Sequence, residues 1–465
     1  MSALTTTPMD PVRPQSAREL FALSCELASR YTEELDAREV VPGPEALAGL
    51  SAFGGALPLE GTSAEEVIRQ LDRVGSPATV ASTGGRFFGF VVGGALPVAI
   101  AAQWLATAWD QNAGSWVLAP GAAELEAVAA EWMLELLGLP RDAAVGFVTG
   151  STMGTFSSLA CARSALLARQ NYDVKRRGLA NAPRTSIVVS DEIHPTNLSA
   201  LGYLGFGTDD VQRAPTDEQG RILPDEMPEL GSNTIVMLQA GNINSGAFDP
   251  FEEICRRARG AGAWVHVDGA FGLWARASRS KEHLARGVEL ADSWSVDGHK
   301  WLNLPQDSAI YVCRDAQAVQ DVFGLEATYL MRDERRQPNT FVPELSRRAR
   351  GVEFWAALKA LGKRGVEDLV DRSCAHARTF AEGLRRAGYE VLNDVVLNQV
   401  VFACEDEAST RAALARIQAS GVTWLGPTTW RGRFSMRISV SSWATTEDDV
   451  ERSLQVMRQA IGEAV

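Results

Sequence analysis

Four short polar runs contain the residue types that can do chemistry, and each follows an apolar run. The first, residues 149–155, reads Thr-Gly-Ser-Thr-Met-Gly-Thr. Glycines let a backbone approach a ligand closely, and hydroxyls with free amides at a helix start suit a phosphate. The same residues also suit an ordinary capped helix. The run nearly matches the GxSxG elbow of serine hydrolases, with Thr152 at the nucleophile position, so a hydrolase stays a remote alternative.

The other three runs supply a histidine, an aspartate and a lysine. His194 ends the run 190–194, Asp268 ends the apolar run 264–268, and Lys300 follows a histidine in the run 297–301. A carboxylate that ends an apolar segment needs a cationic partner, which Mg²⁺ or a protonated ring nitrogen could supply. A desolvated lysine amine is a nucleophile. Taken alone, each residue is also compatible with a structural role, and we expect His266 to be packed in the core.

A sheet is the element that could bring these residues together. Apolar, β-branched runs occur between helical patterns such as 155–169 and 251–260, at residues 145–148, 186–189, 234–238, 264–267, 293–296 and 309–312. This alternation predicts an α/β fold whose mostly parallel sheet is covered on both faces. Ligands of such sheets bind at the carboxyl ends of the strands, where all four polar runs lie. A phosphate cradle, an imidazole, a carboxylate and a lysine are together what pyridoxal phosphate requires.

The flanking segments predict two further parts. Residues 1–93 read as a helical N-terminal arm, with apolar periodicity over 17–37 and a capped helix start at Ser63. Such an arm cannot bury its own apolar stripe and must dock, which indicates a second subunit. Residues 94–355 form the predicted cofactor domain. Residues 356–465 are expected to form a small α+β domain, with helices near 366–387 and 409–420 and strands near 396–403 and 435–440.

Composition narrows the class of protein. The 465 residues carry a net charge of −13, with 46% hydrophobic and 22% charged residues, which excludes disordered and collagenous chains and argues against nucleic acid as a partner. Six cysteines without a CxxC pair, and no visible signal peptide, predict a cytoplasmic protein with reduced thiols. The uncharged segment 87–109 is long enough for a membrane span, but its glycines, Pro97 and Gln103 favour a loop and a core helix, so no membrane association is expected.

The motifs resemble the group II pyridoxal-phosphate-dependent amino-acid decarboxylases, which include aromatic-L-amino-acid and glutamate decarboxylases. The similarity extends from about Arg86 to Gly365. It implies the aspartate-aminotransferase-type fold (pyridoxal-phosphate fold type I), with a seven-stranded, mostly parallel sheet. It also implies pyridoxal 5'-phosphate as cofactor, no catalytic metal, and a homodimer whose sites lie at the subunit interface.

The resemblance assigns a role to each matching residue. Lys300 carries the cofactor as a Schiff base, Asp268 pairs with the pyridine nitrogen, and His194 stacks on the ring. Ala270 lies under the opposite ring face. Asn242 is expected near the ring hydroxyl, where family members often have threonine. The residues expected to hold the phosphate are Ser151, Thr152, Ser293 and His299.

The implied reaction is decarboxylation of an L-amino acid to its amine and CO₂. Tyr329, in the segment 327–330, matches the loop tyrosine that protonates the α-carbon, and a tyrosine there favours the amine over an aldehyde. Phe90 and Val92 align with the substrate-pocket loop and favour an aromatic or other bulky side chain. Oxidative deamination to an aldehyde, lyase or aldol-type cleavage, and a non-catalytic interaction protein remain alternatives. No arginine is placed by spacing as a substrate carboxylate clamp, since Trp443 stands where some relatives have one.

Overall fold

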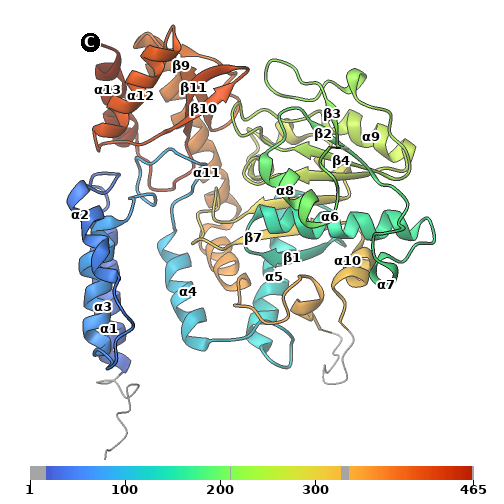
Figure 1. The fold of residues 1–465 in the computed structure, drawn as a ribbon, viewed down its shortest axis with the longest axis horizontal. Coiled ribbons are helices and arrows are strands. Elements are labelled where there is room, and N and C mark those ends of the chain that lie inside the picture. Colours follow the sequence, from blue (N-terminus) through green and yellow to red (C-terminus); the bar gives the residue numbers. More distant parts are fainter. Residues whose placement is uncertain (1–16, 210, 326–334, 463–465) are drawn as a thin grey trace, which may run out of the picture.

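The computed structural model describes residues 17–209, 211–325 and 335–462. Figure 1 shows three parts: a helical arm at the N-terminus, a large domain around a central sheet, and a smaller C-terminal domain beside the arm. The predicted division at residues 93/94 and 355/356 stays a prediction. One helix, α11, runs through the second boundary and is interrupted at Gly362, whose φ of 59° lies in the left-handed region.

The central sheet has seven strands in the order β1-β7-β6-β5-β4-β2-β3. Strand β7 is antiparallel to both of its neighbours, and the remaining pairs are parallel. The strands are β1 Ala144–Val148, β2 Ser186–Ser190, β3 Val211–Ala214, β4 Thr234–Gln239, β5 Trp264–Asp268, β6 Ser293–Asp297 and β7 Ala309–Cys313. This confirms the predicted α/β fold with a seven-stranded, mostly parallel sheet.

Helices cover both faces of this sheet, and neighbouring strand residues are buried on opposite sides. In β2, Val188 belongs to the core beneath α5, α9 and α11, whereas Ile187 and Val189 pack with α6, α8 and α10. Burial on both faces explains why the strands read as continuous apolar runs rather than alternating ones. The helices are α5 Pro120–Leu137, α6 Ser151–Ala168, α7 Val174–Arg177, α8 Pro195–Tyr203, α9 Phe251–Ala261, α10 Ala316–Phe323 and α11 Gly351–Arg386.

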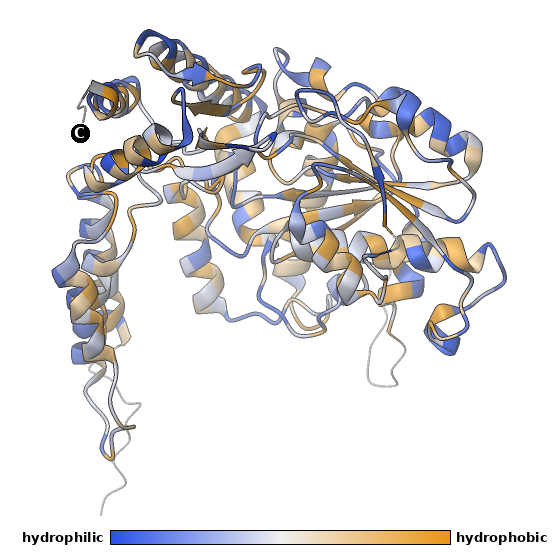
Figure 2. Ribbon diagram, turned by 45° about the horizontal axis from the view of Figure 1, so that its top comes forward, coloured by the Kyte–Doolittle hydropathy of each residue, from blue (hydrophilic) through white to orange (hydrophobic). Residues whose placement is uncertain are grey.

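The N-terminal arm projects from the body of the molecule (Figure 2). Ser63 caps α3 as predicted, because its side chain accepts a hydrogen bond from the amide of Glu66 at 3.2 Å. The arm is joined to the C-terminal domain by a 2.7 Å bond from the amide of Val40 to the carbonyl of Gly421. No helix in the described part of the chain is long and apolar enough to cross a membrane. The helices are α1 Ala17–Glu33, α2 Pro44–Gly49, α3 Ala64–Gln70 and α4 Pro97–Trp109.

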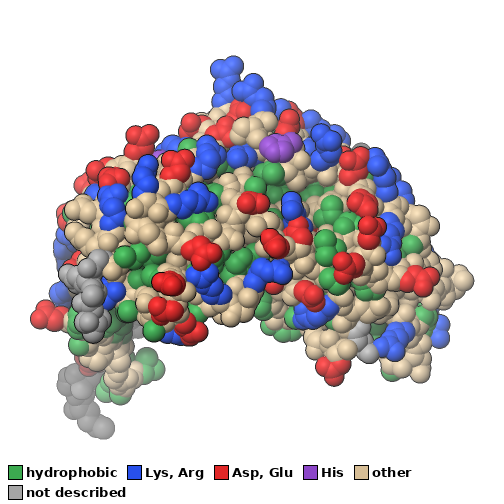
Figure 3. All heavy atoms as spheres, turned by 90° about the horizontal axis from the view of Figure 1, so that it is seen from above, with side chains coloured by type: hydrophobic (Ala, Val, Ile, Leu, Met, Phe, Trp, Pro, Cys, Tyr) green, Lys and Arg blue, Asp and Glu red, His purple; other side chains and the backbone are tan. Residues whose placement is uncertain are grey.

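The C-terminal domain packs a four-stranded antiparallel sheet, ordered β10-β11-β9-β8, against three helices. Its remaining elements are β8 Glu390–Val391, β9 Gln399–Ala403, α12 Glu407–Ala419, β10 Gly426–Trp430, β11 Arg433–Ser439 and α13 Glu447–Gly462. Acidic and basic side chains are interspersed across the face in Figure 3.

Candidate active site

All four polar runs contribute residues to the wall of a cavity of about 190 Å³ at one end of the central sheet. The first run lies at the start of α6 and the others follow β2, β5 and β6. The lining side chains come from segments more than a hundred residues apart. The lining residues are Gly150, Ser151, Thr152, His194, Thr196, Gln239, Gly241, Ile243, Asp268, Ala270, Phe271, Asp297, His299 and Lys300.

Lys300 lies in the turn that follows β6, and its Nζ is 2.8 Å from Oδ2 of Asp297. Gly298, between the two, has no room for a side chain, because a Cβ there would lie 2.6 Å from the ring of Phe354. On the other side of the turn, a Cβ at Gly93 would lie 1.7 Å from the carbonyl oxygen of Lys300. Close packing on both sides therefore fixes the backbone that presents the lysine.

Asp297 is buried between three polar groups. Its Oδ1 accepts the amide hydrogen of Ser151 at 2.6 Å and lies 3.7 Å from Nε2 of His299. Burial opposes the charge, but Lys300, His299 and these hydrogen bonds outweigh it and hold the pKa of Asp297 below its usual range. The side chain is therefore a carboxylate at neutral pH.

Asp268 ends β5 with its carboxylate held by two donors. Oδ2 accepts from Nδ2 of Asn197 at 2.7 Å, and Oδ1 accepts from the amide of Ala270 at 3.1 Å. The carboxylate thus faces the cavity in a fixed orientation and can pair with a protonated ring nitrogen. The described residues contain no group of three or more His, Cys, Asp or Glu that could hold a metal ion.

His194 is the N-cap residue of α8, and its Nδ1 lies 2.7 Å from Oγ1 of Thr196. Burial lowers the pKa of His194. The charge of Lys300 lowers it further and that of Asp268 raises it in part, so the ring is neutral at pH 7. A neutral imidazole is suited to stacking on an aromatic ring. The second histidine of the sheet, His266, is buried with a pKa lowered to about 4, which confirms its predicted place in the core.

The start of α6 fits a phosphate. Oγ of Ser151 is buried and has no hydrogen-bond partner among the described residues. Gly150 provides no side-chain cap, and among the amides of the first turn only that of Ser151 has a described side-chain acceptor, Asp297. The ring of His299 accepts at Nδ1 from the amide of Ser308 at 3.4 Å, which leaves Nε2 as a donor. An orphaned hydroxyl beside open amides is the chemistry that a phosphate group satisfies.

Three predicted residues are not brought to the cavity by described contacts. Ser293 stands at the start of β6, at the other end of the strand from Asp297, and its hydroxyl bonds in the core with Trp264 and His266, so its role in holding the phosphate stays a prediction. Asn242 closes its own loop, where its Oδ1 accepts from the amide of Asn244 at 2.8 Å, and does not line the cavity. Tyr329 lies outside the described residues.

The predicted substrate loop lies next to the lysine turn. Phe90 is 68% exposed, and its ring stacks on Trp424 at 5.2 Å between centroids. Phe87 stacks on the same tryptophan at 5.0 Å. Phe90 and Val91 both have φ in the left-handed region, at 55° and 56°, which is costly for non-glycine residues and marks a constrained loop. Neither Phe90 nor Val92 lines the cavity within one chain, so their substrate role stays a prediction.

Sequence reasoning missed three residues. Asn197 supports Asp268 and could have been found from its position one helical turn after His194. Asp297 was seen only as part of the lysine motif. Arg437 of β11 donates to the carbonyl of Ile243 at 3.1 Å, burial lowers its pKa to about 10, and no ion pair is described for it. Nothing in the local sequence distinguishes Arg437 from an ordinary strand arginine.

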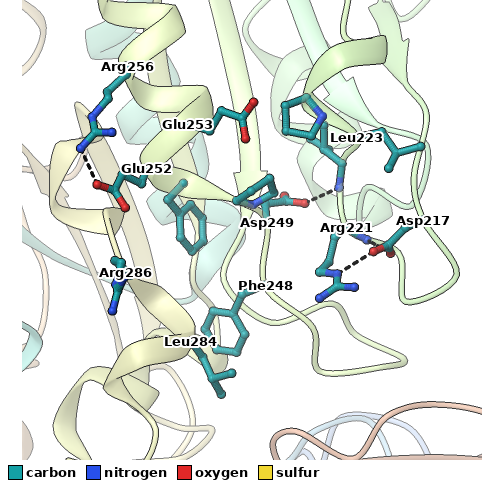
Figure 4. A pocket seen from close by; sticks show the side chains of 14 residues that line it. Asp217, Arg221, Leu223, Phe248, Asp249, Glu252, Glu253, Arg256, Leu284 and Arg286 are labelled. Carbon is teal, nitrogen blue, oxygen red and sulfur yellow. Dashed lines mark hydrogen bonds and ion pairs between the residues drawn. The ribbon is translucent and has the colours of Figure 1, made fainter.

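A larger hollow, of about 790 Å³, lies elsewhere on the large domain (Figure 4). Four of its charged side chains form two ion pairs, since Arg221 bonds Asp217 at 2.6 Å and Arg256 bonds Glu252. Asp249 is occupied by the amides of Ile222 and Gln239. Since these groups satisfy one another, the smaller cavity around Lys300 is the better candidate for the active site.

The chain was compared with known proteins. Residues 51–405 match the pyridoxal-dependent decarboxylase conserved domain. An aromatic-L-amino-acid decarboxylase of Bacillus atrophaeus is 26% identical over 434 residues, which is 88% of each chain. An acidic amino acid decarboxylase of Mus musculus is 28% identical over 332 residues, 68% of this chain and 60% of the relative.

Solved structures share the fold. A crystal structure of Oryza sativa TDC with PLP and tryptamine has a TM-score of 0.89 at 21% identity and covers 97% of this chain and 99% of that one. Rhodiola rosea 4-hydroxyphenylacetaldehyde synthase has a TM-score of 0.83 at 20% identity, over 96% and 98% of the two chains. Because the family model matches more than half of its length, this chain belongs to the pyridoxal-dependent decarboxylase family, whose members are amino-acid decarboxylases with pyridoxal phosphate as cofactor.

Proposed function

We propose that this chain removes the α-carboxylate of an L-amino acid with an aromatic or other bulky side chain, to give the amine and CO₂. The observation that carries this proposal is the meeting of Lys300, Asp268 and His194 in one cavity beside the open N-terminus of α6. These residues match the four requirements of the cofactor: an amine, a carboxylate, a flat neutral ring and a phosphate site.

Each residue has a task in the proposed reaction. When bound, the cofactor draws away the electron pair that the departing carboxylate leaves on the α-carbon. Asp268, oriented by Asn197, keeps a proton on the ring nitrogen and so stabilises that charge. His194 packs on the ring and excludes water. Lys300 attaches the cofactor through Nζ, and either its released amine or the hydroxyl of Tyr329 returns a proton to the α-carbon.

The choice of a bulky substrate is supported by the loop 87–92. Its aromatic rings and Trp424 form a stack beside the lysine turn, and Phe90 leaves much of its ring available for contact. Relatives of this chain include enzymes named for aromatic and for acidic substrates. Arg437 is the arginine best placed to meet a substrate carboxylate, since it lies half-buried beside Ile243 of the cavity wall with no described ion pair.

The second candidate is oxidative conversion of the same substrates to aldehydes. It is favoured by the similarity of the fold to an aldehyde synthase. Tyr329, proposed as the proton donor to the α-carbon, favours the amine. A panel of L-amino acids with mass-spectrometric identification of products distinguishes the two, because the aldehyde route also yields ammonia and peroxide. Amine and CO₂ from aromatic substrates support the proposal, whereas aldehyde as the main product contradicts it.

The proposed partner is a second copy of the chain. The arm and the helix α4 expose large apolar side chains that the described residues of the chain leave uncovered: Phe21, Leu47, Phe53, Leu57, Leu59, Trp104 and Trp109. Exposed apolar surface on this scale is typical of a subunit interface. Sedimentation equilibrium tests the point, and a monomer at micromolar concentration would contradict it.

Attachment of the cofactor is tested without substrate. The purified protein should show the visible absorption of lysine-bound pyridoxal phosphate, and Lys300→Ala should lose this absorption while its thermal unfolding stays cooperative. Exposed Lys175→Ala is the matched control and should keep the absorption. Equal absorption in Lys300→Ala and the native protein would refute the assignment of Lys300.

A further inference from the structure

One carboxylate holds two groups that the cofactor needs. Oδ1 of Asp297 accepts the amide hydrogen of Ser151 at 2.6 Å, and Oδ2 lies 2.8 Å from Nζ of Lys300. The amide belongs to the first turn of α6, which we assign to the phosphate. The amine of Lys300 is the group assigned to the aldehyde of the cofactor. Asp297 therefore bonds both ends of the site at once.

The carboxylate cannot keep these partners when the cofactor binds. Attachment through Nζ removes the free ammonium of Lys300, and a phosphate at the start of α6 competes for the amide of Ser151. Asp297 is only 2% exposed, so water cannot replace the lost bonds. The donor left within reach is Nε2 of His299, 3.7 Å from Oδ1. Two anions would then share one helix end and one imidazole, and like charges in a buried site disfavour each other.

We propose that Asp297 is a resident anion of the cofactor site whose negative charge weakens binding of the phosphate group. It caps α6 in place of the missing side-chain cap at Gly150 and directs Lys300 towards the cavity. Asp297 is thus a positioning residue whose charge sets the affinity for the cofactor. Asparagine at this position would keep an oxygen for the amide of Ser151 without the negative charge.

The test compares phosphate binding by apoproteins, because inorganic phosphate probes the α6 end alone. Asp297→Asn should bind inorganic phosphate about tenfold or more tightly than the native apoprotein in calorimetry, since a charge within ~4–6 Å shifts an ionisation equilibrium by about one to three powers of ten. The gain should persist when Lys300→Met is added, because the amide of Ser151 remains. Asp297→Ser is a second neutral variant, used if Asp297→Asn does not fold, and should bind more tightly as well.

Asp191→Asn is the matched control. Asp191 is an exposed carboxylate three residues before His194, so the change removes one charge near the site without touching Ser151 or Lys300. Its phosphate affinity should equal that of the native apoprotein. Equal or weaker phosphate binding by the neutral Asp297 variants would overturn the inference. Since the inference rests on the cofactor site proposed above, pyridoxal phosphate is titrated in parallel: a native protein that fails to bind it refutes the proposed function instead.

Discussion

Replacing Gly93 with alanine should displace the lysine turn. Gly93 lies in the loop before α4, and an added Cβ would stand 1.7 Å from the carbonyl oxygen of Lys300 and 3.1 Å from that of His299. The φ of Gly93 is outside the left-handed region, so this contact alone decides the outcome. The separation must grow by about 1.8 Å to reach an ordinary van der Waals distance.

Either the loop that contains Gly93 or the turn that contains Lys300 can move to relieve this contact, and each movement has a cost. Overpacking of a tight interior destabilises a protein by about 1–3 kcal/mol. A shift of about 1 Å in a reacting group lowers turnover by about a hundredfold. Gly93→Ala should therefore lower the temperature of unfolding, weaken cofactor attachment and lower kcat for the best substrate of the amino-acid panel.

The measurements are differential scanning calorimetry, titration of the visible absorption with pyridoxal phosphate, and steady-state kinetics. Gly202→Ala is the control, because a Cβ at this helical glycine of α8 meets nothing within 4 Å. It should leave cofactor binding unchanged and stabilise the fold by up to about 1 kcal/mol through helix propensity. Native stability, cofactor affinity and turnover in Gly93→Ala would refute the view that this contact positions Lys300.

Two further changes test buried charges. Arg437→Met removes the guanidinium beside Ile243 and should raise KM for the substrate about tenfold or more, while the visible absorption stays native; an unchanged KM would contradict a contact with substrate. Glu126→Gln breaks a buried group in which Glu126 bonds Arg347 at 2.7 Å and Arg336 at 2.9 Å, and should destabilise the fold by about 3–5 kcal/mol. Burial opposes the charge of Glu126, but the two arginines hold its pKa below the usual range, so its stabilising contribution is complete above the unfolded pKa of 4.5 and is lost as pH falls through the folded pKa. Calorimetry across this acid range should show a smaller loss of stability in Glu126→Gln than in the native protein.

The strands that could be predicted from the sequence are those buried on both faces. Six of the seven strands of the large sheet were expected, and each carries at least three consecutive buried residues. The missed strand, β3 Val211–Ala214, is an edge strand with exposed Gln212 and Arg213, so it has no apolar run to mark it. Exposure of these two residues explains the omission, since the other edge strand, β1, is buried throughout and was predicted.

Site residues were predictable where a strand end placed them. Lys300, Asp268 and His194 follow strands whose carboxyl ends meet, and the sheet order brings them together as expected. Ser293 shares a short motif with Lys300 but stands at the opposite end of β6, where its hydroxyl bonds with Trp264. A sequence motif that spans a whole strand does not show which of its residues lie at the carboxyl end of that strand.

The charges that line the cavity explain why Asp297, three residues before Lys300, is expected to affect phosphate binding. The titratable lining groups are one lysine, two aspartates and two histidines. Burial lowers the pKa of both His194 and His299, so neither adds positive charge at neutral pH. A dianionic phosphate must then be held by amides and hydroxyls of α6, in a cavity where the aspartates already outnumber the lysine. Neutralising Asp268 would remove the partner of the ring nitrogen. An asparagine at position 297 would keep an oxygen for the amide of Ser151 and lose only the ion pair with the free amine of Lys300, so Asp297 is the charge through which we expect cofactor affinity to be tuned.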